Sequence, residues 1–379
     1  MKKKIAAILV SCSIISVLLI GCVNSTVKST TASSGPTAAI AASSSETLGE
    51  GATAEQINAF ITAPSKNPDK IVLRYTSTTA DLDTQAYMKG FREFMKYLKT
   101  ELGDRIEIKY LLNATMGSSA DAILGGLQNR TIEMSDWPLT SYAEFTNAFT
   151  PLDVPYLVTT LDDMHALLSG EAGEYMKQKC LDDTGLRVIF YSVLGSREMT
   201  NSVRPIKSVA DMKGLKFRVQ PNKLHMLGIE AMGATATNIA FAELFTALQQ
   251  GTVDGQENPA DTIYNMQFYD VQKYMSTTDH IITGGSLVMN NDFFEELDPE
   301  MQEVFIAAGE HASDYVMDEL KASLDEVYKN LEKKIEITYL TDEERKEFQA
   351  AAQKAWPQMR EVIGAEYFDK VIELAGVGF

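Results

Sequence analysis

The pattern of apolar and polar positions predicts alternating strands and helices from residue 71 onward. In chain order these are a strand at 71–75, a helix from about 81 to 98, a strand at 106–112, a helix at 120–129 and a strand at 131–135. The first helix repeats its apolar side chains at helical spacing, and the second strand alternates. This β–α–β–α–β order predicts an α/β fold whose sheet carries helices on its faces.

A strand–helix–strand unit follows in the middle of the chain. Asp211-Met-Lys-Gly-Leu-Lys-Phe-Arg218-Val is a glycine-marked turn into a short strand, and a second short strand ends in Glu257-Asn258-Pro259. The amphipathic run 223–246 between them predicts a helix, so the two strands should pair in parallel. Ligands bind at the carboxyl edge of such sheets. An arginine fork and an asparagine amide at that edge suit a carboxylate.

The last predicted element is one long helix. Asp298 is a typical N-cap and Pro299 fits the first helical position, and apolar residues then recur at helical spacing to about residue 334. A helix of this length spans roughly 50 Å at about 1.5 Å per residue. Because that exceeds the diameter of a small domain, the helix should extend over two domains.

The N-terminus predicts export and a lipid anchor. Three lysines precede an apolar stretch at 5–20 that is too short to span a membrane. It ends in Leu19-Ile-Gly-Cys22, which resembles the bacterial lipobox and makes Cys22 the lipidated first residue of the mature protein. The alternative is an ordinary signal peptide with an incidental cysteine. Residues 22–69 are rich in Ser, Thr and Ala and poor in aromatic residues, so they predict a flexible tether.

Composition and motifs narrow the class of function. A formal net charge of −18 argues against nucleic-acid binding, because phosphate would be repelled. The chain lacks H-E-x-x-H, C-x-x-C, G-x-S-x-G and Walker A patterns, and its histidines are isolated from one another and from Cys180. We therefore predict no enzymatic activity, no metal site and no cofactor.

Several of these segments carry a family resemblance. The strings are Asp211-Met-Lys-Gly-Leu-Lys-Phe-Arg-Val, Ala231-Met-Gly-Ala-Thr, Val253-Asp-Gly-Gln-Glu-Asn-Pro and Asp270-Val-Gln-Lys-Tyr. They resemble the substrate-binding proteins of TRAP (tripartite ATP-independent periplasmic) transporters, of the C4-dicarboxylate-receptor type. The resemblance runs from about residue 70 to the C-terminus.

The resemblance implies a bilobed, periplasmic-binding-protein-like fold. Two α/β domains would be joined by interdomain crossovers and backed by the long helix. On this basis we expect residues 1–21 to be the signal peptide and 22–69 the tether. Domain I would comprise 70–194 and 284–323, and domain II would comprise 195–283 and 324–379.

The resemblance also implies a binding site in the second domain. The family's carboxylate-binding arginine falls on Arg218, whose alternative role is a surface or interdomain ion pair. A second family arginine matches Arg197 in Gly195-Ser-Arg-Glu-Met-Thr-Asn201, and its alternative is a structural role. Asn258 matches a ligand-contacting asparagine, and we include Glu257 beside it. Phe241 matches an aromatic residue of the pocket wall, and the sequence is nearly as compatible with a place for Phe241 in the core.

The first domain should supply the variable half of the pocket. Trp137 is predicted to follow the third strand, where it either lines the pocket or packs in the core. Thr76 and Ser77, at the end of the first strand, are further polar candidates. The family arginines fix a carboxylate, whereas this half would select which acid is held.

Together these features predict an extracytoplasmic solute-binding lipoprotein. It would capture a small organic acid by hinge closure and deliver it to the membrane permease of a TRAP-type secondary transporter. The alternative is a sensor component that presents the acid to a membrane signalling protein. In either case the protein would be attached to the cell membrane by its lipid.

Overall fold

A computed structural model describes residues 48, 51–81, 83–117 and 119–379. The predicted signal peptide, Cys22 and most of the predicted tether lie outside these residues. Among the helices that are described, none has both the length and the apolarity to cross a membrane. The final part of the predicted tether is folded, because helix α1 (Ala54–Ile61) buries Ile61 and the hydroxyl of Ser65 donates to the carbonyl of Asp104 at 2.5 Å. A capping box of Thr53 and Gln56 starts this helix.

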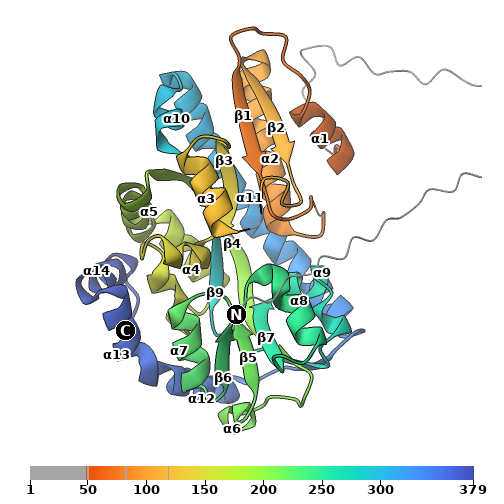
Figure 1. Cartoon of the computed structure of the whole chain (residues 1–379), viewed down its shortest axis with the longest axis vertical. Coiled ribbons are helices and arrows are strands. Elements are labelled where there is room, and N and C mark those ends of the chain that lie inside the picture. The colour runs from red at the N-terminus through yellow and green to blue at the C-terminus, as the bar shows by residue number, and fades with distance from the viewer. Residues whose placement is uncertain (1–47, 49–50, 82, 118) are drawn as a thin grey trace, which may run out of the picture. The chain divides into compact units, whose positions relative to one another are not determined.

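The strands form one continuous path in the order β2-β1-β3-β9-β4-β7-β5-β6, with β8 and β10 beside it (Figure 1). Their bounds are β1 Ile71–Thr76, β2 Ile106–Leu111, β3 Met134–Pro138, β4 Leu186–Asn201, β5 Lys216–Val219, β6 Thr235–Asn238, β7 Gly255–Pro259, β8 Tyr274–Ser276, β9 Ile282–Asn290 and β10 Glu336–Thr338. The pairs β1–β2, β1–β3, β5–β6 and β5–β7 are parallel, whereas β4 and β9 run antiparallel to their neighbours. This is a mixed α/β fold.

Strand β4 joins two groups of strands. Its residues 186–196 pair with β9, and its residues 197–201 pair with β7. We call β1, β2, β3, β9 and residues 186–196 the first lobe. The second lobe comprises β5, β6, β7, β8, β10 and residues 197–201. The apolar pattern of the sequence predicts this strand only over residues 187–193. That prediction is too short, because the polar residues that follow continue the strand by backbone pairing rather than by an apolar pattern.

Two other predicted elements need correction. The run 223–246 is not one helix but α7 (Lys223–Ala231), β6 and α8 (Phe241–Gln249). Gly233, with φ +100°, follows the C-cap residue Met232 of the first helix, and residues 235–238 pair with β5. The third strand begins at Met134 rather than at 131, because Arg130 adopts φ +60° in the preceding turn. The expected parallel pairing of the strands that carry Arg218 and Asn258 is confirmed.

Helix α11 (Pro299–Leu331) is the long helix that the sequence predicts. The side chain of Asp298 accepts from the backbone N–H of Met301 at 3.0 Å, and proline begins the first turn. The helix packs on α2, β4 and α9 and so extends along both lobes (Figure 1). The other α-helices are α2 Ala86–Leu102, α3 Ala120–Gln128, α4 Leu161–Ser169, α5 Glu171–Thr184, α6 Val209–Met212, α9 Ala260–Asn265, α10 Asn291–Glu296, α12 Asp342–Ala352, α13 Trp356–Ile363 and α14 Ala365–Ala375.

The C-terminal helices α13 and α14 contribute to a core of the first lobe. Trp356, Met359 and Phe368 are buried in the same cluster as Tyr142 and Tyr191, and α14 packs on α5. The predicted domain limits stay a proposal. We refine it by assigning α13 and α14 to the first domain, since their apolar faces are covered there.

Candidate ligand-binding site

The second lobe brings Arg218 and Asn258 to one edge of its sheet. Arg218 lies on β5 opposite Gln256 of β7, two residues before Asn258. The flanking Phe217 and Val219 are fully buried in the core, and they fix the strand on which the arginine is carried. Because β5 and β7 are parallel, their carboxyl ends meet at the same edge.

Arg218 is buried without an ionic partner. Its side chain is 1% exposed, and its Nε donates to the carbonyl of Ile239 at 2.8 Å. Its two terminal nitrogens form neither a hydrogen bond nor an ion pair with any residue that the structure describes. Burial lowers the pKa of Arg218 to about 10, which Glu257 opposes and Arg197 reinforces. Desolvation of an unpaired cation is unfavourable, so this guanidinium is ready to receive an anion.

Phe241 lies against this guanidinium at the start of α8. Its ring centroid is 6.0 Å from Cζ of Arg218, and the side chain is 46% exposed. The ring also packs edge-on against Phe268. Phe241 is therefore a partly exposed side chain beside the arginine rather than a core residue.

Arg197 is buried to a similar degree, but each of its three side-chain nitrogens donates a hydrogen bond. Its fork forms an ion pair with the carboxylate of Glu257 and a hydrogen bond to the backbone carbonyl of the same residue. It also donates to Oδ1 of Asn258 at 3.2 Å and to Oγ1 of Thr283 at 3.3 Å. Asn258 in turn donates from Nδ2 to Oε1 of Gln256. Arg197 thus holds the segment that carries Asn258 in place.

Glu257 is the centre of a buried charge cluster. Besides Arg197, its carboxylate lies 3.3 Å from Nδ1 of His225 and 3.4 Å from Nε2 of His280. Burial raises the pKa of Glu257, but Arg197 and His225 outweigh burial and hold the pKa well below its ordinary value. From the sequence we interpreted these histidines as isolated from one another. That interpretation was wrong, because both contact the carboxylate of Glu257. The residues are distant along the chain, and the sheet brings them to one carboxylate.

In the first lobe, the predicted polar residues lie at the ends of β1 and β3. The hydroxyl of Thr76 donates to the carbonyl of Leu111 at 2.9 Å, and that of Ser77 to Thr79 at 3.3 Å. Trp137 is 9% exposed, and it packs in the core of this lobe. Its indole N–H has no hydrogen-bond partner among the described residues. The tryptophan is thus a core residue with one polar atom unused.

Asp136 and Gln85 are acceptors in this lobe that the sequence did not indicate. The carboxylate of Asp136 accepts from the hydroxyl of Tyr75 at 2.8 Å, and burial raises the pKa of Asp136 to about 6. Oε1 of Gln85, just before α2, is buried with no partner within the described part of the chain. Neither residue belongs to a recognisable motif. Their only sequence signal is a polar residue at the end of an apolar strand or at the start of a helix.

The two lobes meet where β3 and β5 end. Nδ2 of Asn222 donates to Oδ2 of Asp153 at 2.7 Å and to the hydroxyl of Thr140 at 3.2 Å. Nε2 of His225 lies 3.2 Å from Oδ1 of Asp153. Thr140 follows β3 by two residues and Asn222 follows β5 by three, so the ends of these strands face each other.

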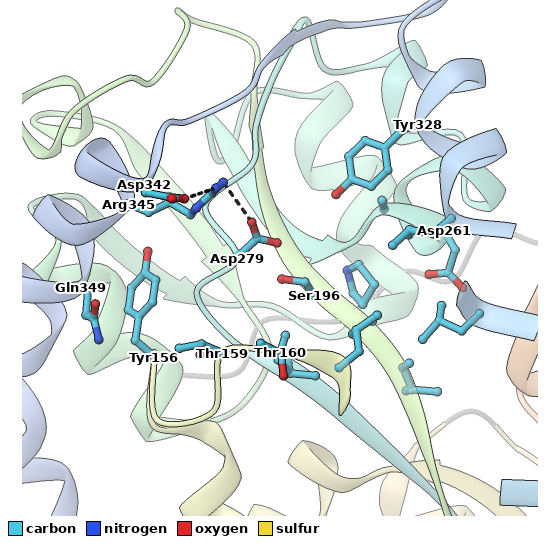
Figure 2. Close-up of a pocket in the computed structure, with 18 of the residues that line it drawn as sticks. Tyr156, Thr159, Thr160, Ser196, Asp261, Asp279, Tyr328, Asp342, Arg345 and Gln349 are labelled. Carbon is cyan, nitrogen blue, oxygen red and sulfur yellow. Dashed lines mark hydrogen bonds and ion pairs between the residues drawn. The ribbon is translucent and has the colours of Figure 1, made fainter. Parts of the chain in front are cut away.

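A cavity of about 520 Å³ lies on the other side of the connecting strand (Figure 2). It is lined by Gly195 and Ser196 of β4, by α11, and by α12, where Arg345 pairs with Asp279 at 3.3 Å and Asp342 at 3.0 Å. None of the predicted ligand-binding residues lines it. Successive side chains of a strand point to opposite faces, so Ser196 faces this cavity whereas Arg197 faces Glu257.

The structure shows no candidate metal centre within the described residues. No group of three or more His, Cys, Asp or Glu side chains there is arranged to hold a metal ion. The cluster around Glu257 is instead neutralised by Arg197. At the edge of β5 and β7, the buried guanidinium of Arg218 offers hydrogen-bond donors suited to an anion.

Comparisons with known proteins agree with this geometry. A family model described as bacterial extracellular solute-binding protein, family 7, matches residues 77–362. The 2,3-diketo-L-gulonate-binding periplasmic protein of Escherichia coli is 29% identical over 279 residues, which cover 74% of this chain and 84% of that protein.

Two solved structures share the fold. The sugar acid binding protein of Advenella mimigardefordensis, in complex with galactonate, has a TM-score of 0.75 and 25% identity and covers 82% of this chain and 99% of its own. A TRAP periplasmic solute binding protein from Polaromonas, bound to D-erythronate, has a TM-score of 0.74 and 27% identity, with coverage of 82% and 100%. The predicted bilobed α/β fold is confirmed.

Proposed function

Because the chain belongs to family 7 of the bacterial extracellular solute-binding proteins, we propose that it captures a small organic acid and delivers it to the membrane subunits of a TRAP transporter. As a substrate-binding protein of this type, it is not an enzyme. The observation that carries the proposed ligand is Arg218, a buried cation with no ionic partner among the described residues. A ligand carboxylate would accept two charge-assisted hydrogen bonds from its terminal nitrogens.

We assign the other second-lobe residues supporting roles. Asn258, held by Arg197, presents its amide beside the carboxylate, and Phe241 closes the wall. Glu257 acts through Arg197, because its carboxylate is already surrounded by donors. A hydrogen bond to a charged group contributes about 1.5–3 kcal/mol. One such interaction with the carboxylate favours closure of the lobes over the ligand, but it does not specify which acid is bound.

The first lobe favours an acid that carries hydroxyl groups. Asp136 and Gln85 offer acceptors, Trp137 offers one unused N–H, and Thr76 and Ser77 lie beside them. A second carboxylate would face Asp136 without a neutralising cation, whereas a hydroxyl can donate to it. The Escherichia coli relative is named for 2,3-diketo-L-gulonate, and the two solved structures hold galactonate and D-erythronate. Each of these compounds has one carboxylate and several oxygen substituents. We therefore propose a polyhydroxylated monocarboxylate.

The proposed location follows from the N-terminus. Export by the segment 1–21 and lipidation of Cys22 would place the folded part outside the cytoplasm and attach it to the membrane near its permease. Metabolic labelling with a radioactive fatty acid tests this. The wild-type protein should carry label and Cys22→Ser should not, and equal labelling of both proteins would refute the anchor.

Ligand-induced stabilisation tests the proposed ligand class. A compound that binds only the native state raises the unfolding midpoint. We expect galactonate and erythronate to raise it more than succinate does, and Arg218→Met to abolish the response. If no carboxylate stabilised the wild-type protein, the organic-acid assignment would be wrong. If succinate stabilised it as strongly as galactonate, only the proposed role of the first lobe would fail.

A further inference from the structure

A buried polar junction connects the lobes at one histidine. His225 of α7 lies between two carboxylates, with Nδ1 3.3 Å from Glu257 and Nε2 3.2 Å from Asp153. Nε2 is also 3.3 Å from the hydroxyl of Thr140. The three titratable side chains are at least nine-tenths buried and come from three elements, namely α7, β7 and the 3₁₀ turn Thr150–Asp153.

The number of N–H groups on His225 decides whether both carboxylates are satisfied. A protonated imidazole has two donors and can serve both carboxylates at once. A neutral imidazole has one donor and presents a lone pair to the other carboxylate. Glu257 retains Arg197 and His280 in that case, but Asp153 keeps only the neutral amide of Asn222 within the described residues.

The junction leads directly to the binding site. Glu257 holds Arg197, and Arg197 holds Asn258. Asn222, which shares Asp153 with His225, lies four residues after Arg218. A change in the position of His225 would therefore reach both strands that present ligand-binding groups.

Given the organic-acid binding proposed above, we propose that His225 is a positioning residue whose bound proton ties Asp153 to Glu257 and thereby fixes the ligand-binding arrangement. Loss of that proton leaves Asp153 buried without a cationic partner among the described residues. The ends of β3 and β5 then separate at this junction, and affinity for the ligand falls. Ligand capture is in this way linked to the pH outside the cell.

The direction of the pH dependence follows from the charges around the ring. Burial lowers the pKa of His225, but Glu257 and Asp153 outweigh burial and raise it above the ordinary value of about 6.5. His280, on the other side of Glu257, has its pKa lowered by burial, which favours its neutral form. The contribution of His225 is therefore complete below about pH 6.5, and it is lost as the pH rises through the raised pKa.

Calorimetric titration of the full-length mature protein with galactonate between pH 6 and pH 9.5 tests the proposal. We expect Kd to rise at least about tenfold across this range in the wild-type protein, which corresponds to about 1.4 kcal/mol. His225→Gln should bind weakly at every pH, with a flat profile. Asp153→Asn removes one of the two carboxylates that hold the proton, so its profile should turn at lower pH.

Two further measurements keep the test decisive. His165→Gln changes a histidine that pairs with Asp314 at 3.3 Å, away from this junction, and should retain the wild-type profile. Nuclear magnetic resonance of the imidazole protons reports the titration of His225 in the wild-type protein without ligand. A His225 titration below pH 6.5, or a wild-type pH profile in His225→Gln, would overturn the proposal. Failure to bind any carboxylate would instead count against the proposed function.

Discussion

Two arginines of the second lobe differ in their surroundings although both are almost completely buried. Arg197 uses its whole fork on Glu257, Asn258 and Thr283, whereas Arg218 donates only to one backbone carbonyl within the described residues. Internal partners offset the desolvation of the first arginine, and the second has no such compensation. The difference supports our proposal that Arg197 maintains the site and Arg218 receives the ligand. Burial alone does not distinguish these roles, but the inventory of partners does.

The largest expected effect is on stability at Arg197. Arg197→Met would leave the buried carboxylate of Glu257 without its guanidinium, and breaking such a pair costs about 3–5 kcal/mol. Urea unfolding should show this loss in the free energy of unfolding. Arg197→Lys is the matched control, because it keeps the charge and should lose less. A stability within about 1 kcal/mol of wild type in Arg197→Met would contradict the structural role.

Arg218 should show the opposite pattern. Arg218→Met removes an unpaired buried cation and keeps an apolar stem, so the free energy of unfolding should stay within about 1 kcal/mol of wild type. Binding of the organic acid should weaken by about 1.5–3 kcal/mol or more, since the charged hydrogen bonds are lost. Calorimetry and urea unfolding of the same preparation measure both quantities. Near wild-type affinity would remove Arg218 from the site.

A smaller loss of affinity is expected at Trp137, where a single N–H group can be removed. Trp137→Phe keeps most of the buried aromatic surface but removes the unused N–H. If this group binds the ligand, affinity should fall by about 0.5–1.5 kcal/mol, the net contribution of one hydrogen bond. Unchanged affinity, measured by calorimetry, would make Trp137 a core residue only.

The smallest effect is expected at Ser196, next to Arg197 but on the other face of β4. Its hydroxyl is buried without a partner among the described residues. Ser196→Ala should therefore leave stability unchanged or raise it by a few tenths of a kcal/mol, about the range of most surface substitutions. Affinity for the acid should not change, because the cavity beside Ser196 contains none of the proposed binding residues. A large loss of affinity would place the ligand in that cavity.

The elements predicted best from the sequence are those whose cap, turn and apolar pattern all lie within one segment. Helix α11 carries its own cap, proline and apolar repeat within the segment, and it was predicted to within a few residues. The pairing of β5 with β7 followed from their order. Strand β6 was missed because it lies at the edge of the sheet, where only Ala236 of its four residues is buried, and because it lacks an apolar pattern.

The partners within the site were not predictable from the chain alone. Glu257 lies 60 residues from Arg197 and 32 from His225 along the sequence. Only the order of the strands brings them together. The family motif named Arg218 and Arg197 as candidates, but it did not show that the nitrogens of Arg197 already donate to internal partners. That distinction needs side-chain geometry.

The position of β9 also has a consequence for biosynthesis. This strand, Ile282–Asn290, lies between β3 and β4, so the sheet of the first lobe is incomplete until about three-quarters of the chain has been made. Pairings of such long sequence separation slow folding, because a large loop must close before they form. Strands β1, β2 and β3 can pair with one another earlier, but the antiparallel pairs with β9 cannot form before that point. The same strand order that builds the site thus delays completion of the first-lobe sheet until strands β5–β8 of the second lobe have been synthesised.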